Sequence, residues 1–314
     1  MRLIFMGTPD FAVESLKVLV EANCEVVAVI TAPDKPAGRG KKIQQSPVKT
    51  YALSQGIPVL QPPRLKNPEF LETLKSYKAD LQVVVAFRML PELVWDMPKF
   101  GTFNLHGSLL PQYRGAAPIN WAVMNGETET GVTTFFIEKE IDTGKIIFKE
   151  KLAITEEDNA GSIHDKLMEI GGQLVLKTVK AIEKNDYPQI EQEEFEELKP
   201  APKIFKENCE INWSKNSKSI FNFIRGLSPY PGAWTKFENQ KTGETGSLKI
   251  FDSKILDSEE KHLPGEIFTD NKTFLHIATS DGLLTILNLQ IPGKKRLSID
   301  DLLRGYDAEQ IKIC

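Results

Sequence analysis

The stretch FNLHGSLLPQYRGAAP, residues 103–118, begins as a predicted β-strand and continues as a loop. Phe103 and Leu105 alternate with Asn104 and His106, so a period of two places the amide and the imidazole on one face of the strand. Gly107 then ends the strand. Ligands of open α/β sheets bind where strands end, which makes this stretch a candidate functional site. Taken alone, the pattern fits an ordinary half-exposed strand equally well.

The chain before this stretch predicts an α/β fold with a doubly wound, Rossmann-like sheet. A strand at residues 2–6, a helix from Phe11 to about Glu21 and a strand at residues 25–30 form a βαβ opening. Residues 81–87 are an almost unbroken apolar run, which is typical of a central strand that is covered on both faces. Thr8 is the predicted N-cap of the first helix, with Pro9 at its first position. The turn at residues 7–10 lacks the glycine fingerprint of dinucleotide-binding proteins, which disfavours a Rossmann-type oxidoreductase.

Length and composition indicate a globular protein with about two domains. The chain has 314 residues, a net charge of −4 and three cysteines without zinc-binding spacing. The net charge disfavours a general nucleic-acid binder but leaves room for local basic patches. No apolar run approaches the ~20 residues that span a membrane, and the start does not resemble a signal peptide. We therefore expect a cytoplasmic protein without membrane contact.

The C-terminal third has a different pattern from the rest. Residues 190–206 are acidic and then proline-bearing, which predicts a linker after a first domain at residues 1–189. Residues 207–314 contain several short strand candidates separated by turn signals. Such a series predicts a small, OB-like β-barrel as a second domain.

Two segments concentrate positive charge. Residues 31–43 form a predicted exposed loop, since two prolines and two glycines exclude a stable helix, and loops of this kind often bind anions. A second basic segment lies near the end of the chain. Either segment is also compatible with a solvated surface. The candidate nucleic-acid contacts are Lys35, Arg39, Lys41 and Lys42 in the first segment, and Lys294, Lys295 and Arg296 in the second.

The stretch NLHGSLLPQYRGAAP, together with EKEIDTGKII further along, resembles the folate-dependent formyltransferases. The opening GTPDFA and the basic segment PAGRGKK resemble the branch of that family that acts on methionyl-tRNA. The late segments IRGLSPYPGAWT and IPGKKRLSIDDLLRG resemble the C-terminal domain of the same branch. The resemblance covers essentially the whole chain, and it implies that the PAGRGKK loop contacts tRNA, with Arg39 and Lys41 leading.

The resemblance implies that Asn104, His106 and Asp142 are catalytic. Formyl transfer to an amine passes through a tetrahedral intermediate, whose oxyanion needs hydrogen-bond donors and whose amine must lose a proton. An asparagine supplies donors, a histidine moves protons near neutral pH, and an aspartate orients the histidine or accepts the proton. No metal is required. Without the resemblance, Asp142 is more simply an ordinary turn residue.

A folate site is implied on two loops. The family holds the pterin ring with a backbone loop that commonly carries a glycine where this chain has Arg88, and this residue has the reach to contact the folate glutamate or tRNA instead. The candidate folate-binding residues are Ser108, Leu109, Leu110 and Pro111 on one loop, and Ala86, Phe87, Arg88 and Leu90 on the other.

The resemblance implies transfer of a formyl group from N10-formyltetrahydrofolate to the α-amine of methionyl initiator tRNA, by a monomeric enzyme that serves translation initiation. A formyltransferase for a small amine, such as an amino sugar or glycinamide ribonucleotide, is the alternative within the family. A tRNA-binding protein without catalysis is an alternative from another class. The basic PAGRGKK segment favours the tRNA substrate over a small amine.

Overall fold

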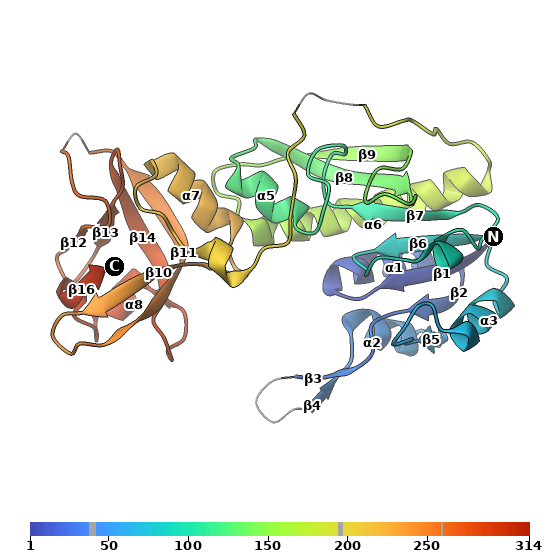
Figure 1. Ribbon diagram of the computed structural model, residues 1–314, viewed down its shortest axis with the longest axis horizontal. Helices are drawn as coiled ribbons and strands as arrows, with labels where there is room; N and C mark the ends of the chain where they lie inside the picture. Colours follow the sequence, from blue (N-terminus) through green and yellow to red (C-terminus); the bar gives the residue numbers. More distant parts are fainter. Residues whose placement is uncertain (38–41, 194–196, 259) are drawn as a thin grey trace. The chain divides into compact units, whose positions relative to one another are not determined.

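The computed structural model describes residues 1–37, 42–193, 197–258 and 260–314, which divide into two compact units (Figure 1). The first unit contains Met1–Pro118, Glu129–Ala153 and His164–Ala201. The second unit contains Ile119–Thr128, Ile154–Ile163 and Pro202–Cys314. Unlike the domains predicted from the sequence, both units are built from separate stretches of chain. Among the described residues, no helix combines the length and the apolar character needed to cross a membrane.

The first unit is built on one mixed sheet, whose strand order is β5-β2-β1-β6-β7-β8-β9. Strands β5 to β7 in this order pair in parallel, whereas β8 and β9 pair antiparallel. The strands are β1 (Arg2–Gly7), β2 (Glu25–Ile30), β5 (Val59–Leu60), β6 (Leu81–Val85), β7 (Thr102–His106), β8 (Glu129–Phe136) and β9 (Ile146–Ala153).

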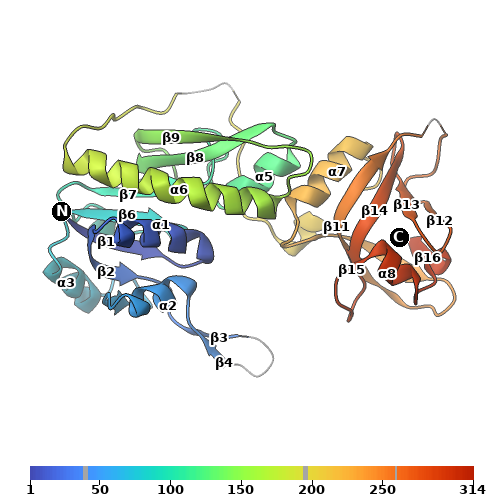
Figure 2. The same ribbon diagram turned by 180° about the vertical axis from the view of Figure 1, so that it is seen from behind.

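Helices cover both faces of this sheet, as Figures 1 and 2 show. One face carries α1 (Asp10–Glu21), α2 (Pro47–Ser54) and the long α6 (Ala160–Glu183), and the other carries α3 (Pro68–Ser76). The short α4 (Glu92–Trp95) shares a core with α3 and therefore lies on the same face. The apolar side chains of β1, β6, α3 and α4 form one continuous core. The predicted doubly wound α/β architecture is thereby confirmed. The predicted cap of α1 was wrong, since Pro9 takes the N-cap position and the helix begins at Asp10.

The order of the strands places the predicted site, on β7, one strand away from the switch point of the sheet, which lies between β1 and β6. From the central β1 the chain builds outward through β2 and β5, then returns to add β6 and β7 on the other side. Gly7 of β1 pairs with Val85 of β6, and Val85 pairs with Leu105 of β7, so these strands end at one edge. The loops that follow β6 and β7 therefore leave the sheet side by side, where α/β proteins bind ligands.

The basic segment after β2 contains a small hairpin where the sequence predicts only a loop. Strands β3 (Lys35–Ala37) and β4 (Lys42–Gln44) pair antiparallel. Asp34, just before β3, accepts hydrogen bonds from Lys49 Nζ at 2.6 Å and from Gln61 Nε2 at 2.7 Å. These bonds lower the pKa of Asp34 and fix the base of the hairpin to the body of the first unit.

The second unit contains an antiparallel sheet with the strand order β12-β13-β14-β11-β10-β16, and β15 adds to β14. Gly265, just before β12, lies against Ile313 of β16, so the sheet curls into a nearly closed barrel, as predicted. Its strands are β10 (Ala233–Asn239), β11 (Thr245–Leu256), β12 (Ile267–Thr269), β13 (Leu275–Ala278), β14 (Leu283–Gln290), β15 (Leu297–Ser298) and β16 (Ile311–Ile313). Its helices are α5 (Pro118–Met124), α7 (Ser217–Gly226), α8 (Ile299–Leu303) and the short η1 (Lys206–Cys209) and η2 (Ala308–Gln310).

Helix α5 packs on α7 at a glycine. Asn120 Nδ2 donates to the carbonyl of Gly226 at 2.8 Å, and a Cβ atom on Gly226 would lie 2.4 Å from Met124 Cγ. Only a residue without a side chain permits this approach. The close contact explains why residues 119–128 group with the C-terminal barrel although the sequence suggested the first domain.

Much of the predicted linker lies on the first unit as ordered chain. Ile190 forms a two-bond antiparallel bridge with Ile146 of β9. Further along, Lys199 accepts a hydrogen bond from the amide of Tyr113, and Ala201, which is fully buried, donates to the carbonyl of Arg114. Ile190 therefore lies against β9, and Lys199 and Ala201 border the loop that follows β7.

Candidate active site

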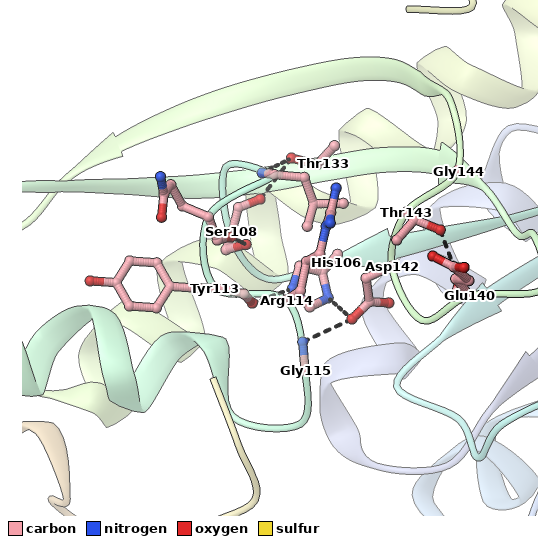
Figure 3. A network of polar contacts seen from close by, with 12 residues as sticks. His106, Ser108, Tyr113, Arg114, Gly115, Thr133, Glu140, Asp142, Thr143 and Gly144 are labelled. Carbon is pink, nitrogen blue, oxygen red and sulfur yellow. Dashed lines mark hydrogen bonds and ion pairs between the residues drawn. The ribbon is translucent and has the colours of Figure 1, made fainter. Parts of the chain in front are cut away.

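The imidazole of His106, at the end of β7, lies beside the carboxylate of Asp142 (Figure 3). Its Nδ1 is 3.8 Å from Asp142 Oδ2, and its Nε2 is 2.8 Å from the carbonyl oxygen of Tyr113. A carbonyl only accepts hydrogen bonds, so Nε2 must carry the proton. Nδ1 is therefore the ring atom that remains able to exchange a proton, and it faces the carboxylate.

Asp142 is presented by the turn between β8 and β9. Its backbone is left-handed, with φ of 56°, and the side chain is only 14% exposed. Oδ2 accepts a hydrogen bond from the amide of Gly115 at 2.9 Å. Within the described ranges, Oδ1 has no hydrogen-bond partner in the protein. One carboxylate oxygen is thus fixed, and the other remains available to a ligand.

Asn104 lies two residues before His106 on the same strand, so both side chains leave the same face of the sheet. The residue is half-buried. In the part of the chain that the structure describes, its side-chain amide forms no hydrogen bond. Two donors are consequently left for a ligand on the face that also carries His106.

The SLLP loop after β7 is fastened by Thr133 of β8. The hydroxyl of Thr133 donates to the carbonyl of Ser108 at 2.7 Å and accepts from the amide of Leu110 at 3.1 Å. Ser108 Oγ donates to the carbonyl of Gln112 at 2.7 Å, and the side chain of Leu110 is fully buried. The side chains of Ser108 and Leu110 therefore stabilise the loop itself. Its backbone and the partly exposed side chain of Leu109 remain as surfaces for a ligand.

Pro111 of the same loop lines a cavity of about 410 Å³ between β9 and residues 188–193. Ile146 and Phe148 supply apolar walls, and Glu191 and Glu193 supply charge. Neither His106 nor Asp142 contributes to the lining. This cavity is therefore separate from the His106–Asp142 pair.

The loop after β6 exposes its backbone at Ala86, and it has both inward-turned and exposed side chains, since Arg88 and Met89 are exposed. Ala86 is exposed with a left-handed φ of 47°, whereas Leu90 is buried and Phe87 packs beside it. Arg88, which replaces the glycine of the family pattern, donates to the carbonyls of Pro62 and Pro63. Burial lowers the pKa of its guanidinium. In this structure Arg88 ties the loop to the segment before α3.

Three residues around the candidate site, Ala86, Tyr113 and Asp142, have positive φ although none is glycine. A left-handed conformation costs an ordinary L-residue roughly 1–2 kcal/mol. Strained residues of this kind persist where the surrounding structure holds them, and they cluster at functional sites. The three positions lie on the loop after β6, the loop after β7 and the β8–β9 turn, which together frame the predicted site.

The basic residues belong to different elements. Lys35 is exposed in β3, and Lys42 lies in β4. Arg39 and Lys41 are outside the described residues. Lys294, Lys295 and Arg296 are exposed on the loop between β14 and β15. The guanidinium of Arg296 lies 4.6 Å from the ring centroid of Phe251, which fixes that end of the loop.

Sequence reasoning missed Gly115, Thr133, Arg114 and Gln192. Gly115 has φ of 125°, and a Cβ atom there would lie 2.5 Å from the carbonyl oxygen of Ala201. Arg114 and Gln192 hydrogen-bond to each other beside Asp142. The glycine of the RGAAP motif is a sequence signal for a close backbone approach at residue 115. No local pattern predicts that residues 192 and 201 contact this loop.

Among the described residues, no cluster of three or more His, Cys, Asp or Glu side chains is able to hold a metal ion.

Comparisons with known proteins agree on one family. The Formyl transferase model matches residues 1–179, and the model of the Formyl transferase C-terminal domain matches residues 203–307. A methionyl-tRNA formyltransferase of Bacteroides fragilis is 58% identical over 98% of this chain and 95% of its own length. A methionyl-tRNA formyltransferase of Flavobacterium johnsoniae is 51% identical over 97% of this chain and 96% of its own.

Solved structures with the same fold are more distant in sequence. The sugar 3N-formyl transferase WlaRD has a TM-score of 0.64 at 19% identity and covers 94% of this chain and 99% of its own. HypX from Aquifex aeolicus in complex with tetrahydrofolic acid has a TM-score of 0.63 at 22% identity, covering 96% of this chain and 47% of its own. From the two family models and the close relatives, this chain belongs to the formyl transferase family, in its methionyl-tRNA formyltransferase branch.

Proposed function

We propose that this protein transfers the formyl group of N10-formyltetrahydrofolate to the α-amine of methionyl initiator tRNA. The observation that carries the proposal is the His106–Asp142 pair at the carboxyl end of β7, next to the switch point of the sheet, with Asn104 on the same strand face. Identity above 50% along nearly the whole chain with methionyl-tRNA formyltransferases supports this substrate. A cytoplasmic location and action as a monomer are part of the same proposal.

In the proposed reaction the α-amine attacks the formyl carbon and a tetrahedral intermediate forms. The Asn104 amide donates hydrogen bonds to the oxyanion that develops, which is where a fixed donor is worth most. The free electron pairs of Asp142 Oδ1 and His106 Nδ1 are the two proton acceptors that the geometry offers. Since Nε2 is committed to the Tyr113 carbonyl, the proton from the amine moves either to Asp142 Oδ1 or to His106 Nδ1, which lies 3.8 Å from Asp142 Oδ2.

Collapse of the intermediate breaks the bond between the formyl carbon and N10 of the folate. The electron pair of that bond goes to N10, which takes up the proton held by the His106–Asp142 pair. The products are formyl-methionyl-tRNA and tetrahydrofolate, so atoms and charges balance without a metal or a redox partner. His106 and Asp142 return to their starting protonation for the next cycle.

We propose that the folate lies against the loops after β6 and β7, with the exposed backbone near Ala86 as its main contact. The tRNA would contact Lys35, Arg39, Lys41 and Lys42 in the basic segment, and Lys294, Lys295 and Arg296 in the barrel. Arginine and lysine side chains on exposed loops suit phosphate contacts. Arg88, whose guanidinium donates to the carbonyls of Pro62 and Pro63, is proposed to shape the folate loop and not to contact tRNA.

A side-by-side transfer assay tests this function. It would supply N10-formyltetrahydrofolate with methionyl initiator tRNA, methionyl elongator tRNA and free methionine. Formylation of the initiator alone is the expected result. Turnover of the donor with a small amine, but with none of these three acceptors, would retain the formyltransferase chemistry and overturn the tRNA substrate.

A further inference from the structure

The turn that carries Asp142 is held by a side chain from the predicted linker. Gln192 Nε2 donates to the carbonyl of Asp142 at 2.8 Å and to the carbonyl of Gly144 at 2.9 Å. Its Oε1 accepts from Arg114 Nε at 3.1 Å and from Arg114 Nη2 at 2.6 Å. Both N–H donors and the oxygen of the Gln192 amide are therefore engaged in hydrogen bonds.

The orientation of the amide follows from its partners. A guanidinium has only donors and a carbonyl only accepts, so the oxygen must face Arg114 and the nitrogen must face the turn. Reversing the amide would break all four bonds at once. The side chain thus joins the β8–β9 turn to the loop that follows β7 in a single arrangement.

Both ends of Asp142 depend on this arrangement. The carboxylate is held by the amide of Gly115, the residue after Arg114, and the main-chain carbonyl is held by Gln192. Asp142 has a left-handed backbone, which aspartate tolerates better than most residues, and the two bonds from Gln192 hold the turn in that conformation. The bridge between Ile190 and Ile146 fixes the chain two residues before Gln192.

We infer that Gln192 is a positioning residue for formyl transfer, which acts by clamping the Asp142 turn so that the carboxylate stays opposite His106. The inference rests on the proposed function of Asp142. Gln192 touches neither His106 nor any reacting atom, and its effect is exerted through the backbone of Asp142. Misplacing a catalytic group by about 1 Å costs up to roughly 100-fold in rate, so loss of the clamp should appear in kcat.

Two substitutions separate the clamp from the interaction with Arg114. Gln192→Glu keeps the acceptor for Arg114, and adds charge to it, but replaces the two donations to carbonyls by repulsion. Gln192→Ala removes both halves. We expect both variants to lower kcat by roughly 10-fold or more with KM for tRNA and folate within about twofold. If Gln192→Glu retains wild-type kcat, the residue serves only to anchor Arg114 and the inference is wrong.

A matched control and a double-variant cycle complete the test. Glu191→Gln changes the neighbouring exposed residue, whose carboxylate pairs with Lys145 at 2.9 Å, and should leave kcat within about twofold. In an Asp142→Asn background, Gln192→Ala should cost far less than it does in the wild type, because the carboxylate it positions is already gone. Equal costs in the two backgrounds would show that Gln192 does not act through Asp142.

One measurement is independent of turnover. The ring ¹⁵N signals of His106 report the carboxylate opposite Nδ1, so Asp142→Asn should displace them. Gln192→Ala and Gln192→Glu should displace them in the same direction, and Glu191→Gln should not. If the wild type formylates none of the tRNAs, the proposed function fails while this measurement still decides for or against the clamp. Unmoved signals in both Gln192 variants would overturn the clamp.

Discussion

The carboxylate of Asp142 is held at the candidate site by a main-chain amide, and this makes its charge separable from its position. The amide of Gly115 binds one carboxylate oxygen, and the side chain of Gln192 holds the backbone of the turn. An amide side chain of the same shape offers one oxygen to that donor as well. A substitution that removes charge but keeps shape is therefore a fair probe of what the carboxylate does.

Asp142→Asn should lower kcat by at least about 100-fold, the usual loss when a proton-transferring side chain is removed. The amide cannot accept the proton of the attacking amine, and it gives His106 Nδ1 no negative charge to face. KM for tRNA and the melting temperature should stay near the wild-type values. Single-turnover and steady-state formylation would measure this, and a variant that retains turnover would remove Asp142 from the mechanism.

At the scale of elements, α6 approaches the sheet through adjacent glycines that face different neighbours. A Cβ atom on Gly171 would lie 2.8 Å from Leu105 Cδ2, in the core under β7. A Cβ atom on Gly172 would lie 3.4 Å from Glu14 Cγ and Val18 Cγ2 of α1, which is an ordinary distance for packed side chains. The two positions share one helix and one residue type but differ in the space around them.

Gly172→Ala should stabilise the first unit by up to ~1 kcal/mol, since alanine favours the helix by about that amount. Gly171→Ala gains the same propensity but overpacks the core, which typically costs about 1–3 kcal/mol, so it should be neutral to destabilising. Denaturant unfolding followed by circular dichroism would compare the two free energies of unfolding. Equal and stabilising effects would show that β7 yields to α6 without cost.

The start of α7 is fastened to the β13–β14 turn by Asp281. Asp281 Oδ1 accepts from the amide of Ser217 at 2.7 Å and from its hydroxyl at 2.9 Å. These bonds, with the Ser217 amide contributing most, lower the pKa of Asp281. A carboxyl whose pKa is lower in the folded state adds stability above its unfolded pKa of about 3.9, and this stability is lost as the pH falls.

Asp281→Asn should therefore lower the melting temperature of the second unit at pH 7 by roughly 2–4 °C, a modest change because the group is exposed and screened. The difference from wild type should shrink as the pH is lowered from 5 towards 3, because the wild-type carboxylate becomes protonated. Calorimetry across this range would measure it. A difference that is independent of pH would assign the effect to hydrogen-bond geometry instead of charge.

The sequence predicts those helices and strands whose own residues show an apolar run, a regular alternation or a capping residue. The apolar strand Glu25–Ile30 is found where the sequence places it. The hairpin at Lys35–Ala37 was missed because no alternation marks it. The contact of Gln192 with the Asp142 turn was not predicted, because the two residues are far apart in the sequence. The acidic composition of residues 190–206 is typical of a linker and gives no sign of such a contact. Alternation placed Asn104 and His106 on one face, but the approach of Asp142 depends on tertiary packing.

At the scale of the whole molecule, positive charge is local although the chain carries a net charge of −4. One basic segment adjoins the first unit's β3–β4 hairpin, and the other lies on a barrel loop of the second unit. Each phosphate that a lysine or arginine neutralises releases counterions when tRNA binds, so the salt dependence of binding reports how many phosphates are bound. The two segments can therefore be tested separately and together.

The triple variant Lys294→Ala, Lys295→Ala and Arg296→Ala should raise KM for initiator tRNA and make log KM depend less steeply on log salt, with the slope falling by about one for each phosphate no longer bound. Arg39→Ala should have the same kind of effect, and combining it with the triple variant should add to both changes because the segments lie on separate units. KM for the folate donor should not move.

Lys254→Ala, an exposed lysine of β11 outside both segments, is the matched control and should leave the slope unchanged. Formylation measured between about 50 and 200 mM salt covers the range in which phosphate binding weakens steeply. If the variants change only the folate KM, the segments belong to the folate site, and tRNA must be bound elsewhere on the protein.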